Sequence, residues 1–541
     1  MRSLPKKYET IIDLLNKNNI LVICSFFFII FIIFSLNLLN YGVSQDEYFS
    51  RTFGFINLNY IGNLIFPDFV SSIKKDKIIP ELESFEHNFY SGAFFEAIIS
   101  ATELLFGIKE KKYQFILRHT FISSFFYISL IFYFKIFQKI FGNWMISLLG
   151  VLFLLLSPRI FAESFYNNKD IFFMSSCIIV TFFFTKYFQE NTWKNAIFFS
   201  FFVSLTITSR VMGVLLPIIF LFLYIFLKYK SKKNLELFYE IIIPIIFSIL
   251  FTYLMWPYLW SNPIENFLNS FEMMKQYEHG GYNLYFGNKV LSNNVPWHYS
   301  LVWISITTPV IFLFLSFIGL LSLKVSILKN EKRNDFFYII FITSILIISI
   351  TLFSIIILNS TLYNGWRHIY FIYPYILFLA IFGFNFILKI ISNKTLKFVF
   401  ILLIFFNLSN IIYWMIKNNP HQYIYFNIIG KKLDITNFDL DYWGLSYYQN
   451  LKSLSEKDKS DKLKIFNTSE TKIFYSLFSL KNEIRSRFVE VKNINEADYV
   501  ITNYYLDEIV NSEKFQNNFN EIQSIVIDNI KINSIFKKKI N

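Results

Sequence analysis

Long apolar runs, separated by short polar segments, fill most of the first 415 residues of the chain. The run over residues 20–39 has about twenty residues, enough for a helix to cross the apolar core of a bilayer. No small-residue cleavage site follows it, so we interpret it as an uncleaved first helix. The pattern predicts an α-helical polytopic membrane protein with about eleven transmembrane helices. The further runs lie near 115–134, 143–157, 171–188, 194–209, 211–228, 239–256, 300–323, 336–357, 370–391 and 397–415.

Basic residues gather in alternate loops between these runs. Positively charged loops stay in the cytoplasm, so the N-terminus is predicted to lie inside and the C-terminus outside. The same loops account for the net charge of +13, and we expect no nucleic-acid partner. The basic loops hold Lys135 and Lys139, Lys186 and Lys194, residues 228–233, residues 324–333, and residues 389–397.

Residues 91–107 are apolar enough for a further span but contain Glu96 and Glu103, which share one face of a helix. Each carboxylate would cost about 2.5–3.5 kcal/mol at the centre of a membrane helix. We therefore expect an amphipathic helix in the interface, within an outer loop over residues 41–114. A second outer loop is expected over residues 257–299.

The composition changes after residue 415, where Lys, Asp, Glu, Asn and Ser become frequent. Short apolar runs at 463–466 and 497–502 are typical of strands, and helical stretches lie between them. The sequence thus predicts a transmembrane domain over residues 1–415 and a small outer α/β domain over residues 416–541.

Two carboxylates follow the first predicted helix. Glu47 has a structural task, because Ser44 and Glu47 have capping-box spacing and Glu47 can pair with Arg51 one turn later. Asp46 has no such task in the sequence, so it is the stronger catalytic candidate of the two.

A second outer segment, residues 157–170, is dense in charge. It contains the candidate substrate-binding residues Arg159, Glu163 and Lys169, and it ends at Asp170, beside an apolar run. A charge at the membrane edge is expensive to bury and is often functional, so Asp170 is a second catalytic candidate.

Cations also stand at the outer helix ends, against the positive-inside trend. Arg210 lies at a tight turn between two short apolar helices, and Arg367 with His368 lies at another outer end. The neighbouring Trp366 and Tyr370 are typical of an aromatic belt. Carboxylates suit a general base, and guanidinium or ammonium groups suit a phosphate. A reaction of a phosphorylated lipid needs both.

At these residues the chain resembles the class-C glycosyltransferases of the protein O-mannosyltransferase and lipid A aminoarabinose transferase type. The resemblance rests on the acidic pair Asp46–Glu47, the helix after it, Asp170, Arg210 and Arg367. It implies a polyprenyl-phosphate-sugar donor, inverting transfer to an acceptor hydroxyl or phosphate, and a bacterial inner membrane whose outer side is the periplasm. Asp46 would be the base, Asp170 would position the acceptor or share that task, and Arg210 would bind the donor phosphate, with Arg367 as a second cation.

The resemblance is weaker before the interfacial helix, where relatives often carry a His-Pro-Pro-like stretch and some bind a divalent metal. Here the residues are Glu86, His87 and Asn88. His87, a candidate substrate-binding residue, could hold a metal with Glu83 or Glu86, but the spacing is not diagnostic, and we expect no required cofactor.

Two other functions fit a polytopic chain. A transporter or flippase of a lipid-linked or anionic substrate would place ionisable residues near the bilayer midplane and often uses inverted repeats. Here the charges lie at helix ends. An envelope scaffold, built around the C-terminal domain, is the third alternative.

Overall fold

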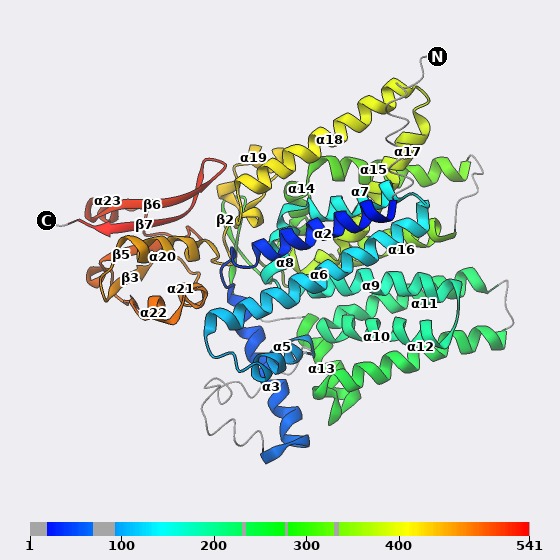
Figure 1. The fold of residues 1–541 in the computed structure, drawn as a ribbon, viewed down its shortest axis with the longest axis horizontal. Helices are drawn as coiled ribbons and strands as arrows, with labels where there is room; N and C mark the ends of the chain where they lie inside the picture. The colour runs from blue at the N-terminus through cyan, green and yellow to red at the C-terminus, as the bar shows by residue number, and fades with distance from the viewer. Residues whose placement is uncertain are drawn as a thin grey trace.

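Long apolar helices form one bundle, and a small sheet domain lies at one end of it (Figure 1). The computed structural model describes residues 19–68, 92, 94–229, 234–275, 280–328 and 335–539. Within these residues, 8 helices are long and apolar enough to cross a membrane, or 10 if each of two bent pairs counts as one span. The bundle helices are α2 (Asn19–Asn37), α6 (Lys111–Phe141), α7 (Trp144–Leu155), α8 (Pro158–Tyr166), α9 (Asp170–Gln189), α10 (Trp193–Ser209), α11 (Leu215–Lys228), α12 (Asn234–Met255), α14 (Tyr299–Thr307), α15 (Val310–Leu328), α16 (Asp335–Ile357), α17 (Tyr373–Ile390) and α18 (Lys394–Lys417).

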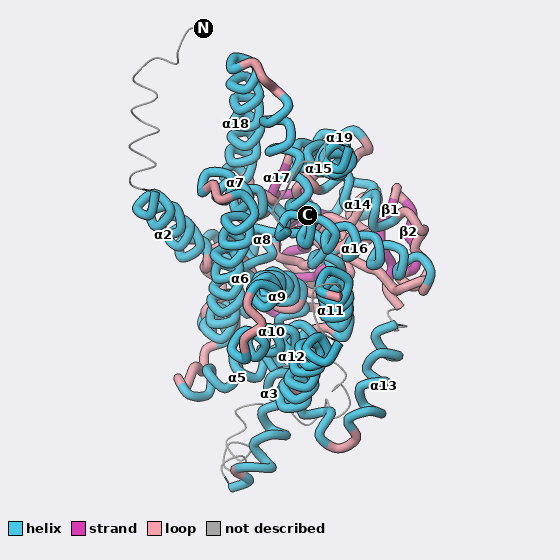
Figure 2. The backbone as a smooth tube through the Cα atoms, turned by 90° about the vertical axis from the view of Figure 1, so that its right-hand side faces the viewer, coloured by secondary structure: helices cyan, strands magenta, loops and turns pink. Residues whose placement is uncertain are grey.

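The helical polytopic fold predicted from the sequence is confirmed. The two bent pairs are α7–α8, with an angle of 70°, and α14–α15, with an angle of 116°. The further span expected near residues 194–209 is α10, a helix of 17 residues that packs beside α9 and α12 (Figure 2). The expected break between two short helices is also present, because α10 ends at Ser209 and the 3₁₀ turn η2 (Val211–Val214) leads into α11.

Glycines bring α15 and α17 into backbone contact. A Cβ added at Gly383 would lie 2.0 Å from the carbonyl oxygen of Leu315, and one at Gly319 would lie 1.9 Å from that of Leu379. Small residues allow such close approach between membrane helices. This packing fixes α17, and the short 3₁₀ helix η4 (Arg367–Ile372) directly precedes it.

Shorter elements cover the end of the bundle near the sheet domain. They are α3 (Gln45–Ile65), α5 (Phe94–Leu105), η3 (Pro257–Trp260), α13 (Pro263–Lys275), β1 (Tyr282–Tyr285) and β2 (Asn288–Leu291). The helix expected at 91–107 is α5, and its acidic face packs inward, so that Glu96 and Glu103 are both buried. A Cβ added at Gly54 of α3 would meet the carbonyl oxygen of Glu96 at 2.5 Å, which shows how closely α3 and α5 pack.

The C-terminal region contains the expected small α/β domain. Its five-stranded sheet has the order β4-β3-β5-β7-β6, in which β3 runs parallel to β4 and β5, while β7 is antiparallel to β5 and β6. Helix α20 packs on the sheet through Leu451 and Leu454, which join a cluster with Ile465, Ile501 and Ile535. The strands are β3 (Leu463–Asn467), β4 (Phe488–Glu490), β5 (Tyr499–Thr502), β6 (Phe519–Ile527) and β7 (Ile530–Lys538), and the helices are α19 (Ile428–Lys432), α20 (Ser446–Lys457), α21 (Ile473–Ser476), α22 (Asn482–Arg485) and α23 (Glu513–Asn518), with 3₁₀ turns at Gln422–Ile424, Ile435–Asn437, Leu477–Ser479 and Ile494–Glu496.

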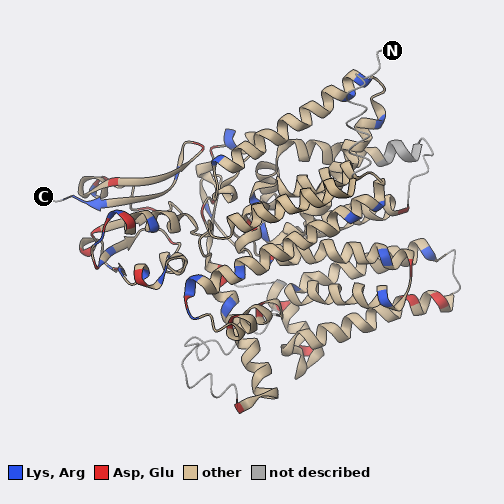
Figure 3. Ribbon diagram, viewed as in Figure 1, with Lys and Arg blue, Asp and Glu red and all other residues tan. Residues whose placement is uncertain are grey.

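Charged residues gather at the two ends of the bundle (Figure 3). Helices α9, α11 and α17 each carry a lysine in the last turn, namely Lys186, Lys228 and Lys389. These ends lie away from the sheet domain (Figures 1 and 3). The opposite ends of α9 and α10 carry Asp170 and Arg210.

Candidate active site

Arg367 joins the two acidic segments identified in the sequence. Its Nη1 donates to Asp46 Oδ2 at 2.7 Å and lies 3.6 Å from Asp170 Oδ2. Asp46 is in the first turn of α3, and Asp170 is the first residue of α9. The Asp46 side chain is 36% exposed, whereas those of Arg367 and Asp170 are 3% and 1% exposed. Asp46 is therefore the more exposed of the two carboxylates.

Arg210 approaches Asp170 from the other side. Its Nη2 is bonded to Asp170 Oδ1, and the side chain is 10% exposed. Arg210 has an extended backbone at the end of α10, where its amide still bonds to the carbonyl of Thr206. Asp170 thus lies between two guanidinium groups.

The α8–α9 link holds Asp170 in place. The side-chain amide of Asn167 donates to Glu163 Oε2 at 2.7 Å and to Asp170 Oδ2 at 3.0 Å, and its oxygen accepts the backbone N–H of Asp170 at 3.0 Å. Glu163 also accepts bonds from the hydroxyl groups of Tyr370, at 2.7 Å, and Tyr442, at 3.3 Å. Glu163 is fully buried, so it fixes Asn167 and contributes to the site through it.

Two aromatic rings contact the Arg367 guanidinium. It lies 4.8 Å from the ring centroid of Tyr363 and 4.6 Å from that of Trp443. Cations over aromatic faces gain electrostatic attraction and lose mobility. Trp443 belongs to the connection between the bundle and the sheet domain, and the turn after it has Gly444 at φ +71. The sheet domain thereby contributes directly to the site.

Glu47 and Arg51 have structural partners. Glu47 accepts the backbone N–H of Ser44 at 2.8 Å, as the capping spacing predicted, and lies 2.9 Å from Nε2 of His119. The expected pair of Glu47 with Arg51 is wrong, because Arg51 bonds to Glu103 of α5 at 2.6 Å. Helix α5 packs closely on α3, so a carboxylate from a distant part of the sequence replaces the local one.

The remaining candidates lie in different places. Arg159 donates to the carbonyl of Tyr425 at 3.0 Å and stacks on Trp303 and Phe426. His368 packs edge-on against Tyr363, with ring centroids 4.4 Å apart.

His87, with Glu83 and Glu86, lies outside the described residues. Among the residues that the structure does describe, no group of three His, Cys, Asp or Glu side chains is placed to hold a metal ion.

The expected aromatic belt at η4 is wrong. Trp366 and Tyr370 are 3% and 1% exposed. The indole N–H of Trp366 donates to Thr307 at 2.9 Å, and Tyr370 donates to Glu163. Both rings are buried because η4 packs against α9 and α16 inside the bundle.

The charges around Asp46 favour its ionised form. Burial raises the pKa of the Asp46 carboxyl, but Arg367, with smaller contributions from Lys169 and Arg210, outweighs burial and keeps that pKa below its usual range. Burial and Arg210 lower the pKa of the Lys169 ammonium, whereas nearby carboxylates partly restore it. Asp46 is therefore a carboxylate at neutral pH and can accept a proton.

An apolar cleft of about 860 Å³ lies near the turn that carries Arg210. Helices α10, α11, α12 and α13 line it, and its polar surface is small. Ile207 and Val214, which flank Arg210 in sequence, belong to its wall. The site thus combines an exposed carboxylate, several cations and an apolar cleft at one end of the bundle.

Comparisons with known proteins identify a family model and solved structures to which this chain is similar. Residues 95–256 match the family model of dolichyl-phosphate-mannose-protein mannosyltransferase. The crystal structure of ArnT from Cupriavidus metallidurans bound to undecaprenyl phosphate superposes with a TM-score of 0.50 at 12% identity, covering 96% of this chain and 98% of that chain. The apo structure of the same protein gives a TM-score of 0.49 at 12% identity, covering 95% and 97%. The sequence matches no curated protein significantly. The resemblance to the class-C glycosyltransferases of the protein O-mannosyltransferase and lipid A aminoarabinose transferase type is thus confirmed, by the family model over residues 95–256 and by the shared fold over nearly the whole chain.

Proposed function

We propose that the chain is an inverting glycosyltransferase that moves a hexosyl or pentosyl group from a polyprenyl-phosphate donor to an acceptor hydroxyl or phosphate. The observation that carries the proposal is the ion pair of the exposed Asp46 with Arg367, beside Arg210 and next to an apolar cleft. A base, an anion site and a lipid groove are the three parts that this reaction needs.

The donor fits the cleft and the cations together. A polyprenyl chain is apolar and fills the space between α10, α11, α12 and α13, while its phosphate lies against Arg210 and Arg367. Guanidinium groups bind phosphate oxygens through paired N–H donors and stay charged at all relevant pH values. Undecaprenyl phosphate, the ligand in the ArnT structure, has this chemistry.

In the transfer, the carboxylate of Asp46 accepts the proton of the acceptor hydroxyl. The acceptor oxygen forms a bond to the anomeric carbon as the bond from that carbon to the donor phosphate oxygen breaks. The phosphate leaves with the electron pair, and Arg367 and Arg210 stabilise its charge. One displacement inverts the anomeric centre, and no covalent enzyme intermediate forms.

Binding of undecaprenyl phosphate to the purified protein tests the proposal. Arg210→Ala and Arg367→Ala should each weaken binding by about 10–100-fold, because each removes charged hydrogen bonds to the phosphate. Lys457→Ala, an exposed lysine on the sheet domain, is the matched control and should bind like the parent. Unchanged affinity in both arginine variants would refute the phosphate site.

The proposed reaction takes place on the periplasmic face of a bacterial inner membrane, with the N-terminus in the cytoplasm and the C-terminal domain in the periplasm. The support is the basic loops at the end of the bundle away from the site. A cysteine placed at Lys232 should react with a membrane-impermeant thiol reagent only after the cells are opened. Labelling of that cysteine in intact spheroplasts would reverse the orientation.

A further inference from the structure

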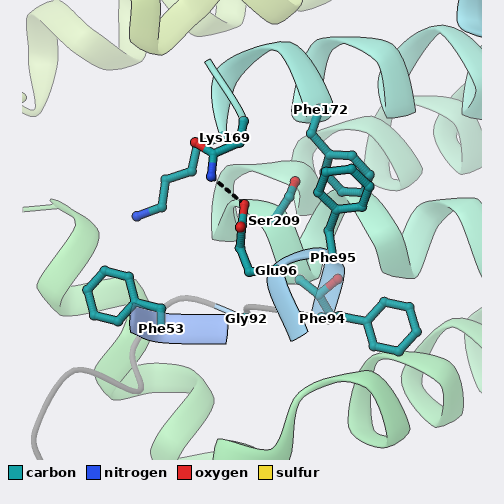
Figure 4. Close-up of a pocket in the computed structure, with 10 residues that line it drawn as sticks. Phe53, Gly92, Phe94, Phe95, Glu96, Lys169, Phe172 and Ser209 are labelled. Atoms are coloured by element: carbon teal, nitrogen blue, oxygen red, sulfur yellow. Dashed lines mark hydrogen bonds between the residues drawn. The ribbon is translucent and has the colours of Figure 1, made fainter. Parts of the chain in front are cut away.

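A small pocket lies next to the charged cluster, which consists of Asp46, Asp170, Arg210 and Arg367. Neighbouring residues of the same segments line the pocket. Its lining includes Lys169 and Ser209, which directly precede Asp170 and Arg210 in the sequence. The start of α5 and Phe53 of α3 close the other side (Figure 4). The pocket is therefore one residue away from both partners of the Asp170–Arg210 ion pair.

Two buried acceptor atoms in this pocket have no hydrogen-bond donor among the residues that the structure describes. The side-chain amide of Asn168 donates to Glu96 Oε1 at 2.6 Å, the dashed line in Figure 4. Among the described residues, Glu96 Oε2 and Asn168 Oδ1 are left without a partner, although the two residues are only 6% and 2% exposed. An unsatisfied buried acceptor costs about 1–3 kcal/mol, and more for a charged group, so these atoms favour a ligand that brings donors.

Phenylalanine rings form much of the remaining lining, namely those of Phe53, Phe94, Phe95 and Phe172. Phe95 and Phe172 are stacked with centroids 4.0 Å apart, and Figure 4 shows Glu96 between this pair and the side formed by Lys169 and Phe53. A group with hydrogen-bond donors on one side and C–H surface on the other fits such a lining. The edge of a sugar ring has this character.

Charge balance favours hydroxyl donors over an ammonium group. Glu96 already interacts with the charges of Arg118 and Lys169. Burial raises the pKa of the Glu96 carboxyl, which these two cations only partly offset. The carboxylate thus has cations nearby and lacks a hydrogen-bond donor at Oε2.

The size of the pocket limits what enters. Its volume is about 20 Å³, close to the space that one water-sized group needs. One hydroxyl-bearing carbon fits, whereas a whole ring does not. The rest of the ring would lie toward Lys169 and the charged cluster.

We propose that this pocket, with Glu96 and Asn168 as acceptors, receives one hydroxyl group of the transferred sugar and selects the donor by it. The inference rests on the proposed function, since it assigns the sugar end of the donor whose phosphate lies at Arg210. Glu96 is then a specificity residue that touches the substrate.

The test is a set of dissociation constants, so no acceptor is needed. The probes are undecaprenyl phosphate alone, the same lipid carrying mannose, glucose or 4-amino-4-deoxyarabinose, and the series of monodeoxy analogues of the sugar that binds most tightly. The parent should bind one deoxy donor about 10–100-fold less tightly than the complete sugar, which corresponds to one hydrogen bond to a charged group. Glu96→Gln should reduce this difference to a few-fold and leave binding of sugar-free undecaprenyl phosphate unchanged. Thr102→Val on the same helix is the control and should keep the full difference.

Three results would overturn the inference. Equal affinity of the parent for every deoxy donor would mean that only water satisfies Glu96 and Asn168. A preference for the amino sugar that disappears in Glu96→Gln would replace the hydroxyl by an ammonium group. An equal loss for all ligands in Glu96→Gln, with a lower melting temperature, would make Glu96 structural. If the parent does not bind undecaprenyl phosphate at all, the proposed function fails first, and the inference fails with it.

Discussion

The Nη1 atom of Arg367 lies 2.7 Å from Asp46 Oδ2, although 321 residues separate the two in sequence. The ion pair keeps the Asp46 carboxyl charged and at the same time places the cation where an anionic leaving group would lie. In the proposed mechanism the base and the phosphate site are thus parts of one arrangement, so that substitutions at Asp46 and Arg367 should not be additive.

Glu47 should matter for stability more than for turnover. Its carboxylate is fully buried, caps α3 at Ser44 and pairs with His119. Glu47→Gln should lower the melting temperature, since a charged hydrogen bond contributes about 1.5–3 kcal/mol. Thermal unfolding in detergent measures this. A variant with parental stability but greatly reduced turnover would make Glu47 a catalytic residue.

The buried cluster of Glu103, Arg51 and Arg118 should hold α5 on α3. Glu103 lies 2.6 Å from Arg51 and 3.5 Å from Arg118. Glu103→Gln removes the carboxylate that the buried Arg51 and Arg118 share and should destabilise the fold by about 3–5 kcal/mol, the usual cost of breaking a buried ion pair. Glu190→Gln, at an exposed helix end, is the control and should have little effect. Similar melting temperatures of the two variants would contradict the assigned role.

His421 should make the protein sensitive to mild acid. Burial lowers its pKa to about 4, whereas an unfolded histidine titrates near 6.5. The unfolded chain binds this proton first as the pH falls, so stability should decrease from about pH 6.5 to pH 4. His421→Gln should remove this part of the loss. Melting temperatures between pH 7.5 and 5 would show it, and parallel curves for parent and variant would contradict it.

No divalent metal should be needed for transfer. In the proposed mechanism, Arg210 and Arg367 supply the positive charge that a metal would otherwise provide at the leaving phosphate. We expect EDTA to leave the rate of transfer within about two-fold, with added Mg²⁺ or Mn²⁺ as the comparison. A loss of activity that Mn²⁺ or Mg²⁺ restores would make a metal part of the site.

The sequence predicted the helical class and the main charged residues of the site, because apolar length and misplaced charge are local signals. Four charged candidates lie at predicted helix ends, and the structure brings them together. They are Asp46, Asp170, Arg210 and Arg367. Charges at helix ends in a membrane protein have few structural uses, so the sequence alone indicates that these residues are functional candidates.

The partners of these residues could not be predicted in the same way. Trp443 stacks on Arg367 from the connection to the sheet domain, and nothing in its local sequence indicates that contact. In the sequence, Glu96 indicates only that residues 91–107 do not cross the membrane. Its hydrogen bond with Asn168 depends on how α5 packs. The predicted pair of Glu47 with Arg51 is wrong for the same reason. The sequence predicts a contact between residues four apart on one helix, whereas Arg51 bonds to Glu103 of α5.

The central claim is that Asp46 is the base of a transfer from a polyprenyl-phosphate-linked sugar. The most direct measurement is the release of undecaprenyl phosphate from the undecaprenyl-phosphate-linked sugar that the protein binds most tightly, in membranes that contain the protein, compared with Asp46→Asn. The account predicts release by the parent, a decrease of about 10²–10⁴-fold in Asp46→Asn, and nearly unchanged donor binding, because the amide keeps the shape of the side chain but cannot accept the proton. Parental turnover in Asp46→Asn would contradict it.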